Sequence, residues 1–334
     1  MGTFLVTGGA GFIGSHLCEA LLEARHRVLV VDDLSTGSWA NVAHLENHPR
    51  FELVVDTICN RGLLADLMRP VDGVFHLAAA VGVRLVVESP VRTVETNVLG
   101  TAAVLELASA AGKRVVLASS SEVYGKSSKV PFAEDDDLVF GSTRIGRWSY
   151  GCSKAVDEFL ALAYARERQL KVTVARLFNT VGPRQTGRYG MVLPRFVRQA
   201  LSSEPITVHG DGTQRRCFCY VGDVVRALIA LMERKDAVGG LFNVGSDEEV
   251  SIAELAERVR QISGSSSTIV TIPYHEAWDE QFEDMPRRVP DLTRIRALTG
   301  FEPSVRLNEI ISRVIDYERS HGSREEPAAK AEPS

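Results

Sequence analysis

Cysteine is scarce, and its arrangement excludes a fold held together by disulfides. The chain has five cysteines in 334 residues, an odd number spread over the whole length, whereas disulfide-stabilised domains are short and dense in cysteine. Cys217-Phe218-Cys219 is the one close pair, and its spacing fits neither a C-x-x-C motif nor a zinc finger. We therefore expect reduced thiols, a cytoplasmic protein and no bound metal.

Long apolar runs and an excess of positive charge are also absent. No run of about 18 apolar residues occurs, so we expect no membrane span. No basic leader precedes the first apolar segment, so we expect no signal peptide. Acidic residues outnumber basic ones by 43 to 38, which gives a net charge of −5 and argues against general nucleic-acid binding. The 45% hydrophobic content is that of an ordinary globular protein.

Short apolar segments alternate with helical patterns in the first half of the chain. The apolar segments are rich in valine, leucine and phenylalanine, as buried parallel strands are, and patterns typical of helices separate them. Strands joined by helices in this way form a doubly wound parallel sheet. We predict such an α/β, Rossmann-type fold, with strands at 4–7, 27–31, 51–55, 73–77, 114–118 and 172–178 and helices at 13–23, 63–68, 91–111 and 153–168.

A glycine-rich turn follows the first predicted strand and opens the first predicted helix. Gly8, Gly11 and Gly14 form a G-x-x-G-x-x-G pattern, in which glycine lets the backbone approach a pyrophosphate at the N-terminus of the helix. Asp32 ends the second predicted strand, where a carboxylate binds the hydroxyls of a ribose. Because Asp33 adds a second negative charge and no arginine stands beside the pair, a 2′-phosphate would be repelled. The motif therefore predicts NAD as the cofactor, in preference to NADP.

The regular alternation ends in the second half of the chain, where glycine- and proline-rich loops interrupt it. We expect an NAD-binding domain over 1–178, with a returning segment near 215–242. A smaller, irregular α/β lobe over 179–214 and 243–318 is expected to bind the substrate in a cleft between the two parts. The tail, 319–334, is rich in serine, glutamate, proline and alanine and is expected to be disordered.

Tyr150 and Lys154 are four residues apart, so a helix presents both on one face. An ammonium beside a phenol favours the phenolate, which can act as a base near neutral pH. The pair follows the fifth predicted strand of a dinucleotide-binding fold, near the edge where such sheets bind ligands. We therefore expect Tyr150 to be the catalytic base and Lys154 to lower its pKa.

With these motifs in order, the chain resembles the extended short-chain dehydrogenases/reductases that modify nucleotide sugars. The resemblance covers roughly residues 2–315. It also includes positions that would not stand out by themselves, namely Asp56, His76-Leu77-Ala78-Ala79, Asn97, the segment 119–125 and Asn179. It implies that NAD contacts Gly8, Gly11, Phe12, Ile13, Gly14, Asp32, Asp33, Asp56, Thr57, Leu77, Ala78, Ala79, Asn97, Tyr150 and Lys154.

The same resemblance implies chemistry at C4 of a nucleotide sugar. Ser120 would hold the 4-hydroxyl beside Tyr150, which would take its proton while C4 gives a hydride to NAD. The family proceeds from the resulting 4-keto sugar to 4-epimerisation, 4,6-dehydration or decarboxylation at C6. A non-catalytic NAD-binding regulator is a further alternative, against which the intact Ser120, Tyr150 and Lys154 argue.

The pair Ser121-Glu122 narrows the choice of reaction. Simple 4-epimerases of this family usually have a small residue in place of Glu122, and dTDP-glucose dehydratases usually have an aspartate in place of Ser121. A Ser-Glu pair resembles the GDP-mannose 4,6-dehydratases and the UDP-glucuronate decarboxylases, and the former commonly use NADP. Arg147 before Tyr150, and Arg216, resemble positions of the decarboxylases.

Decarboxylation of UDP-glucuronate to UDP-xylose or its 4-keto form is therefore the favoured reaction. Oxidation at C4 makes the C6 carboxylate a β-keto acid, which loses CO₂ readily, and Glu122 or a water that it orients would protonate C5. Arg147 and Arg216 would bind either the carboxylate or the diphosphate, and Asn179 and Arg184 complete the expected substrate set. The loop 181–188 looks closer to bacterial sugar epimerases and dehydratases of mixed type, which leaves the base and the sugar open. A 4-epimerase or a GDP-mannose-type 4,6-dehydratase remains the alternative.

The family further implies a homodimer, formed by two helices from each subunit in a four-helix bundle. In this chain the helices predicted at 91–111 and 153–168 would take that place. Both have enough apolar residues to pack on the sheet and on a partner.

Overall fold

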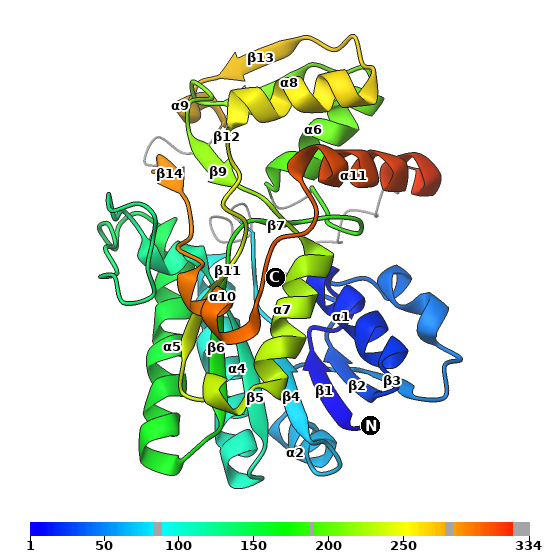
Figure 1. Ribbon diagram of the computed structural model, residues 1–334, viewed down its shortest axis with the longest axis vertical. Coiled ribbons are helices and arrows are strands. Elements are labelled where there is room, and N and C mark those ends of the chain that lie inside the picture. The colour runs from blue at the N-terminus through cyan, green and yellow to red at the C-terminus, as the bar shows by residue number, and fades with distance from the viewer. Residues whose placement is uncertain (83–88, 188–189, 278–282, 323–334) are drawn as a thin grey trace, which may run out of the picture.

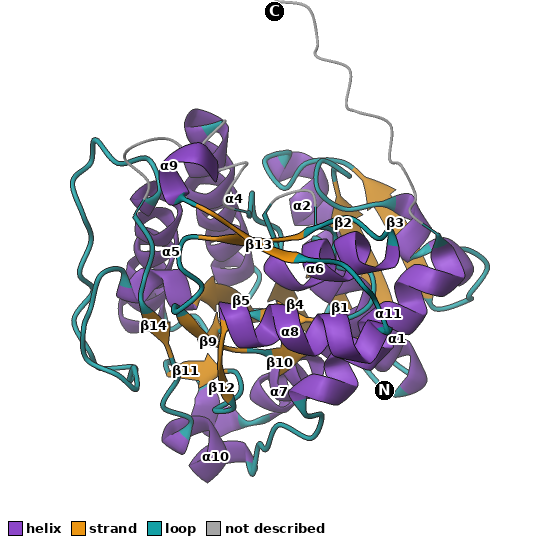
Figure 2. Cartoon of the chain, turned by 90° about the horizontal axis from the view of Figure 1, so that it is seen from above, coloured by secondary structure: helices purple, strands orange, loops and turns teal. Residues whose placement is uncertain are grey.

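The computed structural model describes residues 1–82, 89–187, 190–277 and 283–322. Two parts are stacked along the longest axis of the molecule (Figure 1). One, which we call the sheet domain, holds the large sheet and its helices. The other, which we call the upper lobe, holds short strands and α6, α8 and α11. Seen from above, these three helices lie over the ends of the sheet strands (Figure 2).

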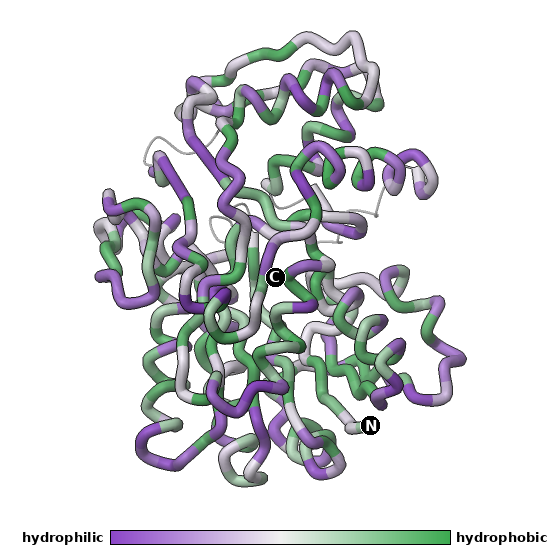
Figure 3. Tube along the Cα trace, in the orientation of Figure 1, coloured by the Kyte–Doolittle hydropathy of each residue, from purple (hydrophilic) through white to green (hydrophobic). Residues whose placement is uncertain are grey.

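The sheet domain is built on seven parallel strands in the order β11-β6-β5-β4-β1-β2-β3. The strand order reverses at β1, because β4 and β2 pair with its two sides, and ligands of such sheets bind at this switch point. Hydrophobic residues follow these strands, as Figure 3 shows. The strands are β1 Thr3–Thr7, β2 Arg27–Asp32, β3 Phe51–Val55, β4 Gly73–His76, β5 Arg114–Ser120, β6 Val172–Leu177 and β11 Leu241–Val244.

Helices cover both faces of this sheet and form a hydrophobic core on each. One core joins the sheet to α1 Phe12–Glu23, α7 Val221–Glu233 and α10 Thr293–Thr299. The other joins it to α2 Arg61–Met68, α4 Pro90–Ala110 and α5 Trp148–Arg168. Short 3₁₀ turns complete the domain at η1 Trp39–Asn41, η2 Ala43–Leu45, η3 Ser121–Tyr124 and η4 Lys235–Ala237.

The upper lobe has a hydrophobic core of its own between α6, α8 and α11. Three small sheets surround it, and two of them join segments far apart in the sequence: β9 pairs with β12 and β14, and β8 pairs with β13. The elements are β7 Thr180–Val181, α6 Val192–Leu201, β8 Ile206–His209, β9 Arg215–Cys217, β10 Cys219–Tyr220, β12 Glu249–Ser251, α8 Ile252–Ser263, β13 Ile269–Ile272, α9 Tyr274–Ala277, β14 Arg287–Arg288 and α11 Leu307–His321.

The predicted α/β fold is confirmed, and the structure divides the chain between the two parts and the tail differently from the prediction in three places. The returning segment comprises α7 and β11, whereas β9 pairs within the upper lobe. A second return, α10, packs on the sheet domain although 243–318 was assigned to the substrate lobe. Helix α11 continues to His321, into the tail that was expected to be disordered, and 323–334 lie outside the described residues.

Among the described residues, no helix has the length and apolar character that crossing a membrane requires.

Candidate functional site

A cleft of about 1570 Å³ lies between the carboxyl edge of the sheet and the upper lobe. Its lining comes from both parts, with Gly8, Asp32 and Tyr150 on the sheet side and Arg216 and Tyr274 on the lobe side. Pockets for one small ligand usually measure about 300–1,000 Å³. The cleft is therefore large enough for a cofactor and a second ligand together.

The glycine turn at the N-terminus of α1 forms a cradle that side chains would fill. Gly8 has a φ of +72°, and a Cβ there would lie 2.8 Å from the backbone nitrogen of Ala78. Gly11 is the N-cap of α1 and supplies no side-chain cap, so the first N–H groups of the helix face the cleft with Phe12 and Ile13. A pyrophosphate is the kind of anion that such a helix end binds. The turn therefore fits NAD.

We expect that replacing Gly14 with alanine destabilises the fold and abolishes NAD binding. The new Cβ would lie 2.1 Å from the carbonyl oxygen of Gly8 and 2.7 Å from the Cα of Gly9. Relieving such a clash must move α1 away from β1, at a cost of about 3 kcal/mol or more. Urea unfolding and the NAD content of the purified variant measure this. Gly62→Ala on α2 is the control, because a Cβ there meets its nearest atom at 3.8 Å; equal losses in both variants would contradict the cradle.

Two acids at the end of β2 are held rigidly beside this cradle. The carboxylate of Asp32 accepts hydrogen bonds from the backbone N–H groups of Ala10 and Leu34, both at 2.9 Å, and burial raises its pKa. Asp33 accepts a hydrogen bond from the backbone of Ser35 at 2.9 Å. The segment 31–41 contains no lysine or arginine to neutralise a 2′-phosphate. The arrangement fits NAD better than NADP.

The other positions expected to hold the cofactor follow the carboxyl ends of β3 and β4. Asp56, Thr57, Leu77, Ala78 and Ala79 all line the cleft. Asp56 is fixed in place, because its carboxylate accepts hydrogen bonds from the backbone of Thr57 at 2.7 Å and from the side chain of Asn60 at 2.9 Å.

Asn97 has a different place from the one expected. Its side chain is fully buried and lies behind the cleft wall. The amide oxygen accepts a hydrogen bond from the backbone of Ala80 at 2.8 Å, and the amide nitrogen donates to Ser153 at 3.2 Å. Asn97 therefore braces the 78–80 segment against α5 and does not itself reach the cleft.

Ser120, Tyr150 and Lys154 meet at the centre of the cleft. Helix α5 begins at Trp148, five residues before the predicted start, so Tyr150 lies on the same helix as Lys154. Burial raises the pKa of Tyr150, and the Lys154 ammonium and a hydrogen bond from Ser120 oppose this only in part. The expectation that Lys154 brings the Tyr150 pKa below its ordinary value is therefore wrong for the free chain.

Lys154 has a buried partner that the sequence pattern did not reveal. Its ammonium donates to the carboxylate of Asp157 at 2.9 Å, and the side chains are 2% and 0% exposed. Burial would lower the pKa of Lys154, but Asp157 and the Tyr150 phenol outweigh it, and the net direction is upward. Lys154 therefore remains a cation in the site.

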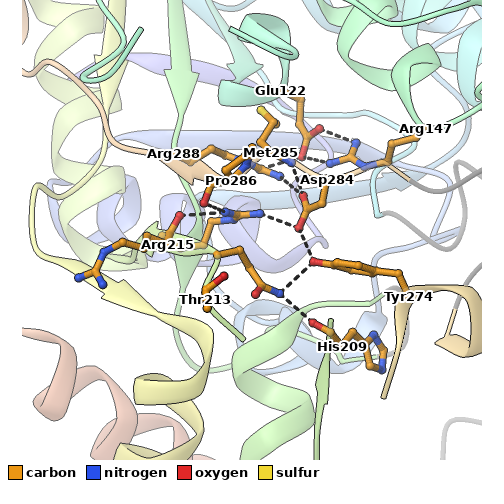
Figure 4. Close-up of polar contacts among 12 residues, drawn as sticks. Glu122, Arg147, His209, Thr213, Arg215, Tyr274, Asp284, Met285, Pro286 and Arg288 are labelled. Carbon is orange, nitrogen blue, oxygen red and sulfur yellow. Dashed lines mark hydrogen bonds and ion pairs between the residues drawn. The ribbon is translucent and has the colours of Figure 1, made fainter. Parts of the chain in front are cut away.

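Arginines and acids form a compact ionic group beside Tyr150, which we call the arginine cluster: Arg147, Arg216, Arg288, Glu122 and Asp284. Figure 4 shows Arg147, Arg288, Glu122 and Asp284 of this cluster. Arg147 contacts both oxygens of Glu122, at 2.8 and 2.5 Å. Arg288 contacts Glu122 at 2.8 Å, and Arg216 contacts Asp284 at 2.8 Å. Glu122 and Arg147 come from the sheet domain and the other three from the upper lobe, so the cluster joins the two sides of the cleft.

The charges in this cluster do not balance. Burial alone would raise the pKa of Glu122, but Arg147 and Arg288 outweigh it and hold the pKa at about 2. Glu122 is thus a carboxylate at neutral pH in the free chain, which favours the expected alternative of an oriented water over proton donation by Glu122 itself. Burial lowers the pKa of Arg288 to about 10, which still leaves it charged. Three arginines face two carboxylates, so the cluster attracts one more anion.

The remaining expected residues are spread along the cleft. Ser121 lies in η3 next to Glu122. Asn179 donates to the carbonyl of Cys217 at 2.9 Å. Arg184 pairs with Glu19 at 2.5 Å and donates to Ser15 at 3.1 Å. Because both partners belong to α1, Arg184 stands near the glycine turn and is not part of the arginine cluster.

Sequence reasoning missed Arg288, Asp284 and Asp157. Arg288 and Asp284 join the cluster because β14 pairs with β9, which carries Arg216, and this contact joins segments about 70 residues apart that no local pattern reports. Asp157 had a local signal, since it lies three residues after Lys154 on a helix.

Comparisons with known proteins agree with this geometry. The pattern of the NAD dependent epimerase/dehydratase family matches residues 4–245. The UDP-N-acetyl-alpha-D-glucosaminuronate decarboxylase of Bacillus cytotoxicus is 42% identical over 316 residues, 94% of this chain and 97% of the relative. UDP-glucuronic acid decarboxylase 1 of Xenopus tropicalis is 39% identical, over 94% of this chain and 72% of its own. The structure of UDP-glucuronic acid 4-epimerase from Bacillus cereus, with UDP-glucuronic acid and NAD, aligns with a TM-score of 0.86 at 30% identity, covering 96% and 100% of the two chains.

Proposed function

Because the chain belongs to the NAD-dependent epimerase/dehydratase family, we propose that it decarboxylates UDP-glucuronate to UDP-xylose or its 4-keto form. The observation that carries the proposal is the excess of three arginines over two carboxylates in the arginine cluster beside Tyr150, counted over the part of the chain that the structure describes. The sugar ring of a neutral hexose nucleotide has no charge for this cluster, so that nucleotide could bind there only through its diphosphate. A uronate also offers a carboxylate, which arginine binds through two parallel hydrogen bonds. We assign the cofactor to the sheet domain and the sugar nucleotide to the side of the cleft formed by the upper lobe.

The first half of the reaction uses Tyr150, Ser120 and Lys154. When bound, NAD would accept the hydride from C4 and would return it to C4 where UDP-xylose, and not the 4-keto form, is the product. Tyr150 takes the proton of the 4-hydroxyl, and Ser120 holds the oxygen of that hydroxyl in position by a hydrogen bond. Lys154, kept charged by Asp157, stabilises the phenolate that Tyr150 must form.

The second half uses the arginine cluster. Once C4 is a ketone, the bond between C5 and C6 breaks, CO₂ leaves, and the electron pair enters a C4–C5 enolate. Arginine contacts hold the carboxylate in position beforehand and exclude water from it. Glu122, ionised and fixed between Arg147 and Arg288, orients a water that protonates C5.

A second candidate is 4-epimerisation of the same uronate. It is favoured by the likeness to the Bacillus cereus 4-epimerase, whose structure holds UDP-glucuronic acid and NAD. Both reactions need a carboxylate site and C4 oxidation, and they differ in whether the C5–C6 bond breaks.

The test is to incubate the purified protein with UDP-glucuronate labelled at C6 and to collect labelled CO₂. UDP-N-acetylglucosaminuronate is assayed in parallel, since the Bacillus cytotoxicus relative is named for it, and UDP-glucose is the control without a carboxylate. We expect CO₂ from at least one uronate. Inversion at C4 with no CO₂ would favour the epimerase.

We further propose a homodimer through α4 and α5, which pack against each other. Their outer faces expose apolar side chains that a partner would cover: Val91 is 69% exposed, Leu99 59% and Phe159 68%. Exposed apolar groups that gather on one face mark interaction surfaces. We expect that Phe159→Asp converts the dimer to monomers, because a charge buried in the interface is costly.

Light scattering at micromolar concentration measures the mass of both forms. Val55→Asp is the control, because Val55 is 57% exposed on β3, away from these helices. A monomeric wild-type protein, or a Phe159→Asp variant that stays dimeric, would contradict the proposed interface.

We further propose that the protein is located in the cytoplasm. All five cysteines lie within the described residues and are free thiols, as expected of a reducing compartment. Cell fractionation tests it, and recovery from an oxidising compartment would contradict it.

A further inference from the structure

Asp284 and Glu122 are held differently, although both face arginines in the same cluster. Glu122 forms ion pairs with Arg147 and Arg288, and its side chain is 10% exposed. Asp284 has one close arginine, Arg216 at 2.8 Å, and its side chain is 19% exposed to the cleft. Its distance to Arg288 is 3.9 Å, too long for a hydrogen bond. Asp284 is the more loosely bound anion.

Arg216 does not depend on Asp284 for its position. Its Nη1 donates to the carbonyl oxygen of Arg215 at 2.8 Å and lies 3.5 Å from that of Pro286. Nη2 donates to the carboxylate of Asp284 at 2.8 Å. If Asp284 left, this guanidinium would remain in place with Nη2 directed into the cleft, ready for another anion.

Asp284 also has partners besides Arg216. One carboxylate oxygen accepts a hydrogen bond from the backbone of Met285 at 2.8 Å, and the other accepts from the hydroxyl of Tyr274 at 3.3 Å. Tyr274 is itself steered by Gln214, which donates to its oxygen at 2.9 Å. Glu283, the preceding residue, anchors the backbone by accepting from Trp148 at 2.8 Å. Release of Arg216 therefore requires only a side-chain movement and strands no buried charge.

The arginine cluster has hydrogen-bond donors that Asp284 does not use. Among the described residues, the Nε of Arg288 is buried without a hydrogen-bond partner, and a buried donor left unpaired is costly. Arg288 and Arg216 both reach Asp284 from the upper lobe. An anion with two or more oxygens, placed where the Asp284 carboxylate lies, could use donors that Asp284 leaves idle.

We propose that Asp284 is a substitute anion, which occupies in the free chain the arginine site that an anionic group of the sugar nucleotide takes on binding. The incoming group replaces Asp284 on Arg216, and Asp284 keeps Tyr274 and Met285 as its hydrogen-bond donors. Asp284 thus sets substrate affinity and specificity: it keeps three arginines from repelling one another in the empty cleft, and only a ligand with a well-placed anion displaces it. The inference rests on the proposed function only in taking a nucleotide sugar as the ligand.

The test is binding of sugar nucleotides to Asp284→Asn, which keeps the shape of the side chain and removes its charge. We expect UDP-glucuronate to bind about tenfold more tightly than to the wild type, the factor expected if Asp284 occupies the site about nine-tenths of the time. Calorimetry on the NAD-loaded protein measures the two affinities. Both proteins, with and without Asp284→Asn, carry Tyr150→Phe so that the ligand is not turned over. Weaker or unchanged binding would overturn the proposal.

Parallel titrations identify the anionic group. Tightening for UDP-glucuronate alone assigns the site to the carboxylate, and equal tightening for UDP-glucose assigns it to the diphosphate. Glu249→Gln is the matched control, because Glu249 pairs with Arg287 at 2.7 Å outside the cleft lining, and it should leave all affinities unchanged. Asp284→Ser provides a second variant should the asparagine disturb folding, which thermal unfolding and NAD content reveal.

This experiment separates the inference from the proposed function. Tighter binding of UDP-glucuronate by Asp284→Asn, without decarboxylation by the protein with an intact Tyr150, would support the substitute anion and refute the decarboxylase. Decarboxylation with no gain in affinity would support the decarboxylase and refute the substitute anion.

Discussion

Replacing Tyr150 with phenylalanine is expected to lower kcat for UDP-glucuronate by about a thousandfold, the usual loss when a positioned acid or base is removed. The phenol of Tyr150 hydrogen-bonds with Ser120 and lies beside the Lys154 ammonium, where it can take the proton of the 4-hydroxyl. Phenylalanine fills the same space and leaves the glycine turn untouched. NAD content should therefore stay as in the wild type, which absorbance of the released nucleotide measures.

The control for this variant is Tyr164→Phe on the same helix. Tyr164 packs against the core beneath the sheet and stacks with Arg168, away from the cleft. It should retain full activity. If Tyr150→Phe turned over at the wild-type rate, the assignment of Tyr150 as the base would be wrong.

Replacing Arg288 with methionine is expected to reduce decarboxylation by about a hundredfold, in the range measured when one partner of a buried charge pair is removed. Arg288 is 8% exposed and holds Glu122 at 2.8 Å. Its loss leaves Glu122 with Arg147 as its remaining close arginine and cancels the excess positive charge of the cluster. Binding of the uronate and orientation of the water at Glu122 should suffer together.

The pH dependence of this variant has a defined sign. Burial pushes the pKa of Glu122 up, and Arg147 and Arg288 hold it at about 2. Without Arg288 the pKa rises, so Glu122 becomes protonated at higher pH and activity is lost earlier on acidification. The acid limb of kcat/KM should therefore move to higher pH. Arg287→Met is the control, because Arg287 is an exposed neighbour that pairs with Glu249; an equal effect in both variants would contradict a specific role for Arg288.

The parts of the site that the sequence predicted are those set by short spacings. Gly8, Gly11 and Gly14 lie within one turn, Asp32 ends the next strand, and Tyr150 and Lys154 share one helix face. Each of these relations depends on local geometry alone. The α/β order likewise follows from segments that alternate along the chain.

The remaining parts depend on contacts between distant segments or on burial. Arg288 and Asp284 lie beside Arg216 because β14 pairs with β9, and Glu283, next to Asp284, is bound by Trp148 of the sheet domain. The raised pKa of Tyr150 and the ionised state of Glu122 both result from burial weighed against neighbouring charges. Spacing in the sequence contains neither quantity, and for that reason Glu122 was expected as a possible proton donor.

The most direct test of the account is the mass and proton NMR spectrum of the sugar nucleotide formed from UDP-glucuronate in heavy water. The account predicts a UDP-pentose or its 4-keto form, lighter by the mass of CO₂ and carrying deuterium at C5, because a solvent water protonates the enolate. A product that keeps all its carbon and is inverted at C4 would contradict decarboxylation, and a lighter product without deuterium at C5 would contradict protonation by water at Glu122.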